Sequence, residues 1–149
     1  MAVANEPTGD LKIMIMNTNG KTLGDTSAVK RKQVICDVVK ATGATLYLFQ
    51  EFRWKGINDD TWGDKLPPQL KYIGNEEAGI LFDKDKVTVE NVRGETDIEK
   101  STLERMCIRK VKTKGVPIVE FICISWHGRS TGKPEKLIEN FEGMLKGCQ

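Results

Sequence analysis

Hydrophobic residues along the first third of the chain alternate between continuous runs and helical spacing. Residues 11–16 and 45–50 are short, nearly unbroken apolar runs that end in polar residues, a pattern typical of buried strands. Between them, apolar residues at helical spacing follow Thr26 and Ser27 and end before Gly43, which predicts a capped helix. The order strand, helix, strand favours a parallel pair of strands joined by a helical crossover.

After this unit the pattern changes to antiparallel β structure. Residues 53–69 are rich in Gly, Pro and Asn-Asp and predict an irregular surface loop. Five later segments are typical of strands: 70–73, 78–82, 86–92, 105–112 and 117–125. Residues 83–85 and 112–115 are typical of hairpin turns, so we expect the flanking strands to pair with each other.

The last segment predicts an amphipathic helix that begins at Pro134 and ends at Gly147. The chain has 149 residues, 30% charged and 39% hydrophobic, which fits one globular domain and excludes a fibrous repeat. We therefore expect a disordered N-terminus over residues 1–10 and a single mixed α/β domain over residues 11–149.

Charge and cysteine content narrow the class of protein only slightly. A net charge of +2 is too small to predict a nucleic-acid or membrane partner by itself. The sequence contains no membrane-length apolar run and no recognisable secretory signal, so we expect an intracellular, soluble protein. The four cysteines and one histidine lack zinc-ligand spacing, and Cys36, Cys107 and Cys123 fit a reduced core.

Three polar residues follow apolar strands, and strand ends are where α/β sheets place their sites. Glu51 offers a carboxylate and Asn17 an amide oxygen, which are ligand types for a hard cation such as Mg²⁺. His127 is suited to protonating or orienting a phosphate oxygen. Arg53 and Arg129, each two residues from one of these groups, are suited to binding phosphate with a guanidinium fork.

Each of these residues also has a structural interpretation. Asn17 and Asn19 lie beside Gly20 and are typical of a turn. A single Glu after a strand is commonly a solvated charge, and a single His is commonly structural. Residue by residue, the structural interpretation is the more common one, and only the joint order of the strand ends favours a site.

Four segments in that order resemble the motifs of a known family. Residues 11–20 read Leu-Lys-Ile-Met-Ile-Met-Asn-Thr-Asn-Gly, and residues 46–53 read Leu-Tyr-Leu-Phe-Gln-Glu-Phe-Arg. Residues 78–86 contain Ala-Gly-Ile-Leu-Phe-Asp, and residues 121–127 read Phe-Ile-Cys-Ile-Ser-Trp-His. Together they resemble the N-terminal half of the endonuclease/exonuclease/phosphatase family, which has the deoxyribonuclease I-like fold.

The resemblance implies both a fold and a site. The fold class would be α/β, a mixed β-sheet with a helical crossover that forms half of a DNase I-like α/β sandwich. Glu51 would bind Mg²⁺ with support from Asn17 and Asn19, Arg53 would back up the site, and His127 would engage the scissile phosphate. The expected function is Mg²⁺-dependent phosphoester hydrolysis by a nuclease or phosphodiesterase, acting on DNA, RNA or a lipid or inositol phosphate.

Departures from the family pattern keep a second function open. Ser125 stands where the third motif usually has Asn, and the later Asp-x-Asn and Asp-His motifs have no match in this chain. Losing a positioned proton donor costs roughly 10²- to 10⁴-fold in rate, so weak activity is expected. The alternative is a half domain that binds or forms a homodimer through an exposed sheet. A third possibility is a fragment of a longer gene product whose function resides in the absent part.

Overall fold

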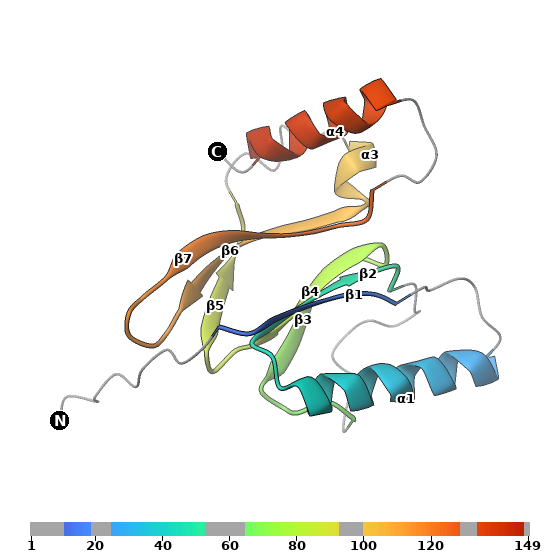
Figure 1. The fold of residues 1–149 in the computed structure, drawn as a ribbon, viewed down its shortest axis with the longest axis vertical. Coiled ribbons are helices and arrows are strands. Elements are labelled where there is room, and N and C mark those ends of the chain that lie inside the picture. Colours follow the sequence, from blue (N-terminus) through green and yellow to red (C-terminus); the bar gives the residue numbers. More distant parts are fainter. Residues whose placement is uncertain (1–10, 19–24, 53–64, 93–99, 129–133, 148–149) are drawn as a thin grey trace.

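The computed structural model describes residues 11–18, 25–52, 65–92, 100–128 and 134–147 (Figure 1). The elements in chain order are β1 (Ile13–Asn17), α1 (Asp25–Thr42), β2 (Leu46–Gln50), β3 (Leu70–Gly74), β4 (Ala78–Asp83), β5 (Val87–Glu90), α3 (Lys100–Leu103), β6 (Met106–Thr113), β7 (Glu120–Trp126) and α4 (Pro134–Gly147). The predicted disorder of residues 1–10 lies outside the described residues and stays a prediction.

A four-stranded sheet with the order β1-β2-β4-β3 contains the predicted crossover unit. β1 pairs with β2 in parallel, and the other two pairings are antiparallel. α1 crosses one face of this sheet (Figure 1). The predicted parallel pair with a helical connection is therefore confirmed, and it brings the C-terminal ends of β1 and β2 to one edge of the sheet.

Aromatic side chains fill the space between α1 and the four-stranded sheet. Tyr47 and Phe49 point toward the helix and are almost fully buried against Ile35 and Val39. The Tyr47 hydroxyl donates to the Val39 carbonyl oxygen at 2.8 Å and accepts the Ala44 N–H at 2.7 Å. Because the Tyr47 hydroxyl both donates and accepts a hydrogen bond, this ring is buried without an unsatisfied polar group.

Glycine ends α1 as the sequence predicts. Gly43 has φ +55° and its N–H donates to the Val39 carbonyl oxygen at 3.1 Å. A left-handed residue after a helix favours glycine because a side chain there meets the following carbonyl oxygen. This stop allows the chain to turn directly into β2.

A second, antiparallel sheet with the order β5-β6-β7 packs on the other face of the first. The two layers meet through two small sets of buried side chains, Leu46, Leu48 and Ile80 from one sheet and Cys107, Val111 and Cys123 from the other. α3 and α4 lie on the outer side of the three-stranded sheet (Figure 1). The result is a two-sheet sandwich with a helix layer on each outside face.

The predicted turn at residues 83–85 exists, but it is not a hairpin. Asp83 accepts the Asp85 N–H at 2.9 Å through its side chain, whereas β4 and β5 belong to different sheets. Both edges of β4 are already paired, with β2 and β3, so β5 has no free edge in that sheet and crosses to the other layer. The hairpin prediction is therefore wrong here, whereas β6 and β7 do form the predicted hairpin.

The last strand begins later than the sequence predicts. β7 starts at Glu120, because Pro117 has no N–H to donate to a strand ladder. The Val119 N–H donates to the Thr113 hydroxyl at 2.7 Å and closes the longer connection. The four-residue helix α3 was not predicted, since four residues are too few to show a helical period.

The expectation that residues 11–16 form a buried strand is wrong for one face of β1. Ile13 and Ile15 are 45% and 69% exposed, although Met14 and Met16 pack against the cluster under α1. β1 is an edge strand, and no described strand of the second sheet covers its inner face. An apolar run is buried on both faces only when both neighbouring layers extend over it.

The cysteines and the length of the helices can be compared with the expectations from the sequence. Cys36, Cys107 and Cys123 are buried and reduced, as predicted for core residues. Among the helices of the described ranges, none is both long and apolar enough to span a membrane.

Candidate functional site

The parallel pairing of β1 and β2 places two of the predicted site residues together. Asn17 lies opposite Gln50 in the ladder, and Glu51 follows directly. The Asn17 side chain donates from Nδ2 to Glu51 Oε1 at 3.0 Å. A turn-forming role alone would leave the Asn17 amide facing its own loop, so this contact favours the site interpretation.

Glu51 has a strained backbone. Its φ of +54° lies in the left-handed region, which costs a non-glycine residue on the order of 1–3 kcal/mol. The Glu51 N–H donates to the Glu77 carbonyl oxygen at 2.9 Å, and the Thr18 hydroxyl lies 3.1 Å from the Glu51 carbonyl oxygen. Such strain persists only where neighbouring groups fix it, and it is often found at functional sites.

His127 joins this pair from the second sheet. It follows β7, and its Nε2 lies 3.0 Å from Glu51 Oε1 while its Nδ1 lies 2.7 Å from Glu77 Oε2. The three side chains are about four-fifths buried, at 17%, 20% and 22% exposure for His127, Glu51 and Glu77. The ring thus lies between two carboxylates, and both nitrogens donate only in the imidazolium form.

Arg105 completes the polar cluster on the far side of the ring. Its Nε donates to the His127 carbonyl oxygen at 2.8 Å and its Nη2 to the Gly128 carbonyl oxygen at 3.2 Å. Nη2 also lies 2.9 Å from His127 Nδ1, but that nitrogen cannot accept this hydrogen bond while it donates to Glu77. We assign the Nδ1–H to a hydrogen bond with Glu77 Oε2, because this contact is the shorter of the two and its acceptor is a carboxylate.

A hydrogen bond between half-buried Gln50 and buried Ser125 links the two sheets beside the site. Gln50 Nε2 donates to Ser125 Oγ at 3.1 Å, and Ser125 Oγ donates to the Phe49 carbonyl oxygen at 2.8 Å. Ser125 is fully buried. Ser125 therefore fixes the end of β7, and with it His127, to the end of β2.

The candidate site offers few protein ligands for a metal ion. Among the described residues there is no group of three or more His, Cys, Asp or Glu side chains that could hold a metal ion. Mg²⁺ binds through one or two carboxylates and keeps several waters, so Glu51 with the Asn17 amide fits this pattern of few protein ligands. The identity of the ion stays a prediction.

Three of the predicted residues lie outside the described residues: Asn19, Arg53 and Arg129. The structure brings together Asn17, Glu51 and His127, whose functional roles stay predictions.

Sequence reasoning did not find Glu77 or Arg105. Glu77 lies in a polar Asn-Glu-Glu turn before β4 and resembles any solvated charge. Since β4 runs antiparallel to β2, its first residues lie at the same edge of the sheet as Glu51. The antiparallel pairing of β4 with β2 places Glu77 there, but the sequence analysis did not predict that pairing, and Arg105 offers no comparable signal.

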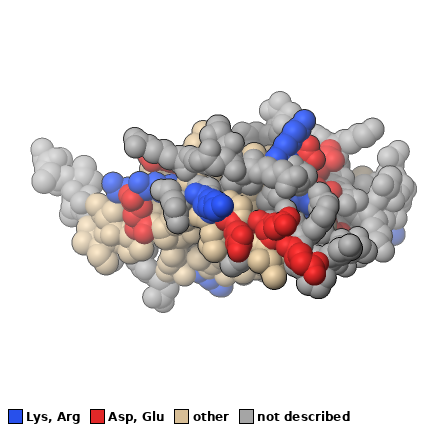
Figure 2. Space-filling model, turned by 90° about the horizontal axis from the view of Figure 1, so that it is seen from above, with Lys and Arg blue, Asp and Glu red and all other residues tan. Residues whose placement is uncertain are grey.

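Charged side chains of both signs are mixed on the outer face of the three-stranded sheet. Figure 2 shows Lys and Arg beside Asp and Glu on the part of this face that the structure describes. This distribution agrees with the small net charge of +2. The described part of this face carries no single-signed surface of the kind that attracts nucleic acid nonspecifically.

Three solved structures share the arrangement of strands and helices. A humanized D. rerio TDP2 has a TM-score of 0.62 at 17% identity, and D. rerio TDP2 complexed with single-strand DNA product has 0.61 at 16%. A mannosyl-6-phosphatase of Bacteroides thetaiotaomicron has a TM-score of 0.65 at 18% identity. Each alignment covers 91% of this chain, but 54%, 52% and 60% of the three structures respectively.

These likenesses show the fold of the chain. It is a mixed α/β arrangement of the DNase I-like type, as the sequence motifs predict, and it spans little more than half the length of the structures it matches. The sequence matches no protein-family model and none of the curated proteins. At such low identity, any shared chemistry rests on the site itself.

Proposed function

We propose that this chain carries a phosphoester-hydrolysing site built on Glu51, Asn17 and His127. The supporting observation is that Glu51 Oε1 lies 3.0 Å from both Asn17 Nδ2 and His127 Nε2, although the three residues come from three strand ends. Side chains on separate elements converge in this way when they act on one bound group. The strained Glu51 backbone supports the same proposal.

Glu51 and Asn17 would hold the metal, with Asn19 as a further ligand and water in the remaining positions. Mg²⁺ bound there would polarise a phosphoryl oxygen and lower the pKa of a bound water. His127 Nε2 lies 3.0 Å from the same carboxylate, so Glu51 would contact both the metal and the imidazole. A site of this kind requires the Glu51 carboxylate and the His127 ring to be positioned to within a fraction of an ångström.

His127 would donate from Nε2 to an oxygen of the bound phosphate. Glu77 accepts from Nδ1 and so fixes the ring orientation and the position of the protons. Arg105 lies 3.5 Å from Glu77 Oε2 through Nη1, which partly neutralises that carboxylate. Arg53 and Arg129 would bind the remaining phosphate oxygens through their guanidinium forks.

The proposed substrates are phosphoesters, with nucleic acid as the first class to test. One structural neighbour is complexed with a single-strand DNA product and another is a mannosyl-6-phosphatase, so both diesters and monoesters belong in the assay. The family's Asp-x-Asn and Asp-His motifs have no match in this sequence, so we expect slow turnover by this chain alone.

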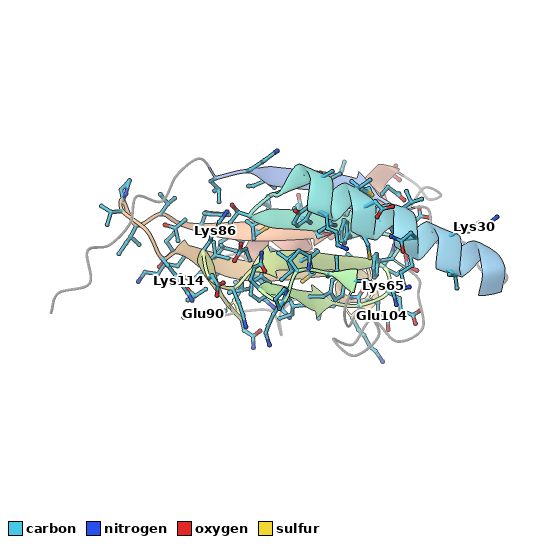
Figure 3. The ribbon with its side chains drawn as sticks, turned by 90° about the horizontal axis from the view of Figure 1, so that it is seen from below. Lys30, Lys65, Lys86, Glu90, Glu104 and Lys114 are labelled. Carbon is cyan, nitrogen blue, oxygen red and sulfur yellow. The ribbon has the colours of Figure 1, made fainter. Side chains whose placement is uncertain are left out.

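Hydrolysis with and without metal tests this function. We expect Mg²⁺-dependent cleavage of a single-stranded oligonucleotide or a nitrophenyl phosphoester, abolished by EDTA and by Glu51→Gln. Glu90→Gln is the matched control, because Glu90 is an exposed carboxylate in β5 (Figure 3). If wild type forms no more metal-dependent product than Glu51→Gln, the proposed function is wrong.

A binding or dimerisation role is the second candidate, supported by the apolar surface beside the site. Ile13 and Ile15 expose their side chains on β1, and β7 is an edge strand among the described residues. Residues 121–126 of β7 carry no charge, so a second copy could pack here without like-charge repulsion.

Light scattering after gel filtration tests the dimer. We expect a dimer at micromolar concentration that dissociates in Ile15→Lys, whereas Val34→Lys, another exposed apolar position on α1, leaves it intact. A wild-type monomer would contradict the dimerisation role and leave hydrolysis to be judged by its own assay.

A further inference from the structure

Arg31 of α1 connects the two strand ends that carry Asn17 and Glu51. Its Nε donates to the Thr18 carbonyl oxygen at 2.8 Å, and its Nη2 donates to the Thr18 hydroxyl oxygen. Nη2 also donates to the Glu51 carbonyl oxygen at 3.1 Å. One guanidinium group therefore ties the residue after Asn17 to Glu51 itself.

The Glu51 backbone is held at both of its ends. Its N–H donates to the Glu77 carbonyl oxygen at 2.9 Å, and its carbonyl oxygen receives the bond from Arg31. The Thr18 N–H donates to the Gln50 carbonyl oxygen at 2.9 Å, which continues the β1–β2 ladder by one residue. Because φ of Glu51 is +54°, these bonds oppose a return to ordinary extended backbone.

Packing favours arginine over lysine at this position. The Arg31 guanidinium carbon lies 5.8 Å from the centroid of the Phe52 ring, within cation–π range. Burial lowers the Arg31 pKa, and the charge of Glu51 acts in the opposite direction. Lysine has one nitrogen and no planar fork, so it cannot reproduce this set of bonds together with the ring contact.

We propose that Arg31 is a positioning residue that holds the left-handed Glu51 backbone and so directs the Glu51 carboxylate toward Asn17 and His127. The part of this inference that concerns metal binding rests on the proposed function. The part that concerns the carboxylate direction rests on the contacts alone.

The single histidine of the chain provides a direct readout of the carboxylate direction. The Cε1–H resonance of His127 is recorded by NMR at fixed pH in wild type, Arg31→Met, Arg31→Lys and Glu51→Gln. We expect Arg31→Met to shift this resonance toward its position in Glu51→Gln, with the other amide resonances retained. Arg31→Lys is expected to shift it in the same direction, since the fork is lost.

Lys30→Met is the matched control for loss of a positive charge. Lys30 is the neighbouring residue of α1, and its exposed side chain projects away from the sheet (Figure 3). We expect Lys30→Met to leave the imidazole resonance unchanged. An unchanged resonance in folded Arg31→Met overturns the proposal, and if that variant does not fold, the same readout in Arg31→Lys decides.

Calorimetric Mg²⁺ binding separates this proposal from the proposed function. We expect Arg31→Met to raise the Mg²⁺ dissociation constant about tenfold, as for other groups that orient a ligand, and Lys30→Met to leave it unchanged. An unaltered dissociation constant in folded Arg31→Met contradicts the metal-directed part. If wild type binds no Mg²⁺, the proposed function fails, while the imidazole resonance still decides the role of Arg31.

Discussion

The two faces of β1 carry similar residues in very different surroundings. Met14 and Met16 pack against the buried cluster that α1 and β2 form, whereas Ile13 and Ile15 are 45% and 69% exposed. Each face carries two aliphatic or thioether side chains, so hydrophobicity does not explain the difference. What differs is whether another layer extends over the strand, and β7 packs against β2 rather than β1.

The side of the four-stranded sheet under α1 and the open face of β1 should therefore respond differently to mutation. Each apolar residue on the covered side contacts both the helix and its neighbours in the sheet, which stabilises the fold. Apolar residues on the open face of β1 make fewer such contacts and should contribute less to stability. The following predictions test this contrast, beginning with the largest expected effect.

Phe49→Ala should cause the largest loss of stability. Phe49 is 1% exposed and stacks on Phe52 at 5.4 Å between ring centroids. Removing a buried ring costs about 3–5 kcal/mol in free energy of unfolding, whereas Ile15→Ala should change it by less than about 0.5 kcal/mol. Urea unfolding measures both, and equal losses for the two variants would show that the open side is covered in solution.

Ser125→Ala should have an intermediate effect, because Ser125 joins the two sheets where both are covered. The change removes the hydrogen bonds that Ser125 Oγ makes with the Phe49 carbonyl oxygen and with Gln50 Nε2, which costs about 1–3 kcal/mol. Thr88→Ala, at an exposed hydroxyl with a 3.5 Å contact, is the control and should be nearly neutral. The same urea titration checks this, and a neutral Ser125→Ala would mean that water replaces the serine.

The loss of stability at alkaline pH should depend on Cys123, which is buried between the two sheets. Burial, followed by the neighbouring Cys107, raises the pKa of Cys123 from 9.0 to about 11. The thiol then ionises more readily in the unfolded chain, so its contribution is complete below about pH 9 and is lost as the pH rises to about 11.

The measurement is the urea midpoint at pH 8 and pH 10.5 in wild type and Cys123→Ala. The midpoint of Cys123→Ala should fall less between the two pH values, although Cys36, Tyr47 and half-buried Tyr72, whose pKa values are also raised, retain part of the slope. Identical slopes in the two proteins would show that Cys123 is already exposed to solvent. This is the smallest of the three effects, since it appears only at alkaline pH.

Local patterns in the sequence predicted most of the elements, because each depends on neighbouring residues. The apolar run before Glu51, the helical spacing that ends at Gly43 and the apolar face of the last helix each correspond to an observed element. The candidate site residues Asn17, Glu51 and His127 were predicted in the same way, as polar residues directly after strands, and their functional roles stay predictions. Their meeting at one point required the parallel pairing and the second sheet.

Other features depended on partners that are distant in the sequence. The turn at residues 83–85 has the composition of a hairpin, but β4 already pairs on both edges, so only the assembled sheet sends β5 to the other layer. In the sequence, Glu77 is an ordinary polar residue of a turn and Arg31 an ordinary residue of a helix. In the structure, both form hydrogen bonds with the backbone of Glu51. Their roles come from contacts that no local pattern encodes.

The sequence by itself therefore determined where strands and helices form, which strand ends carry polar residues, and that the first two strands pair in parallel. Only the tertiary structure decided which apolar faces are covered and which groups hold Glu51 in its left-handed conformation. The physical reason is range: periodicity and turn chemistry act over a few residues, whereas the hydrogen bonds at the site join residues 13 to 76 positions apart.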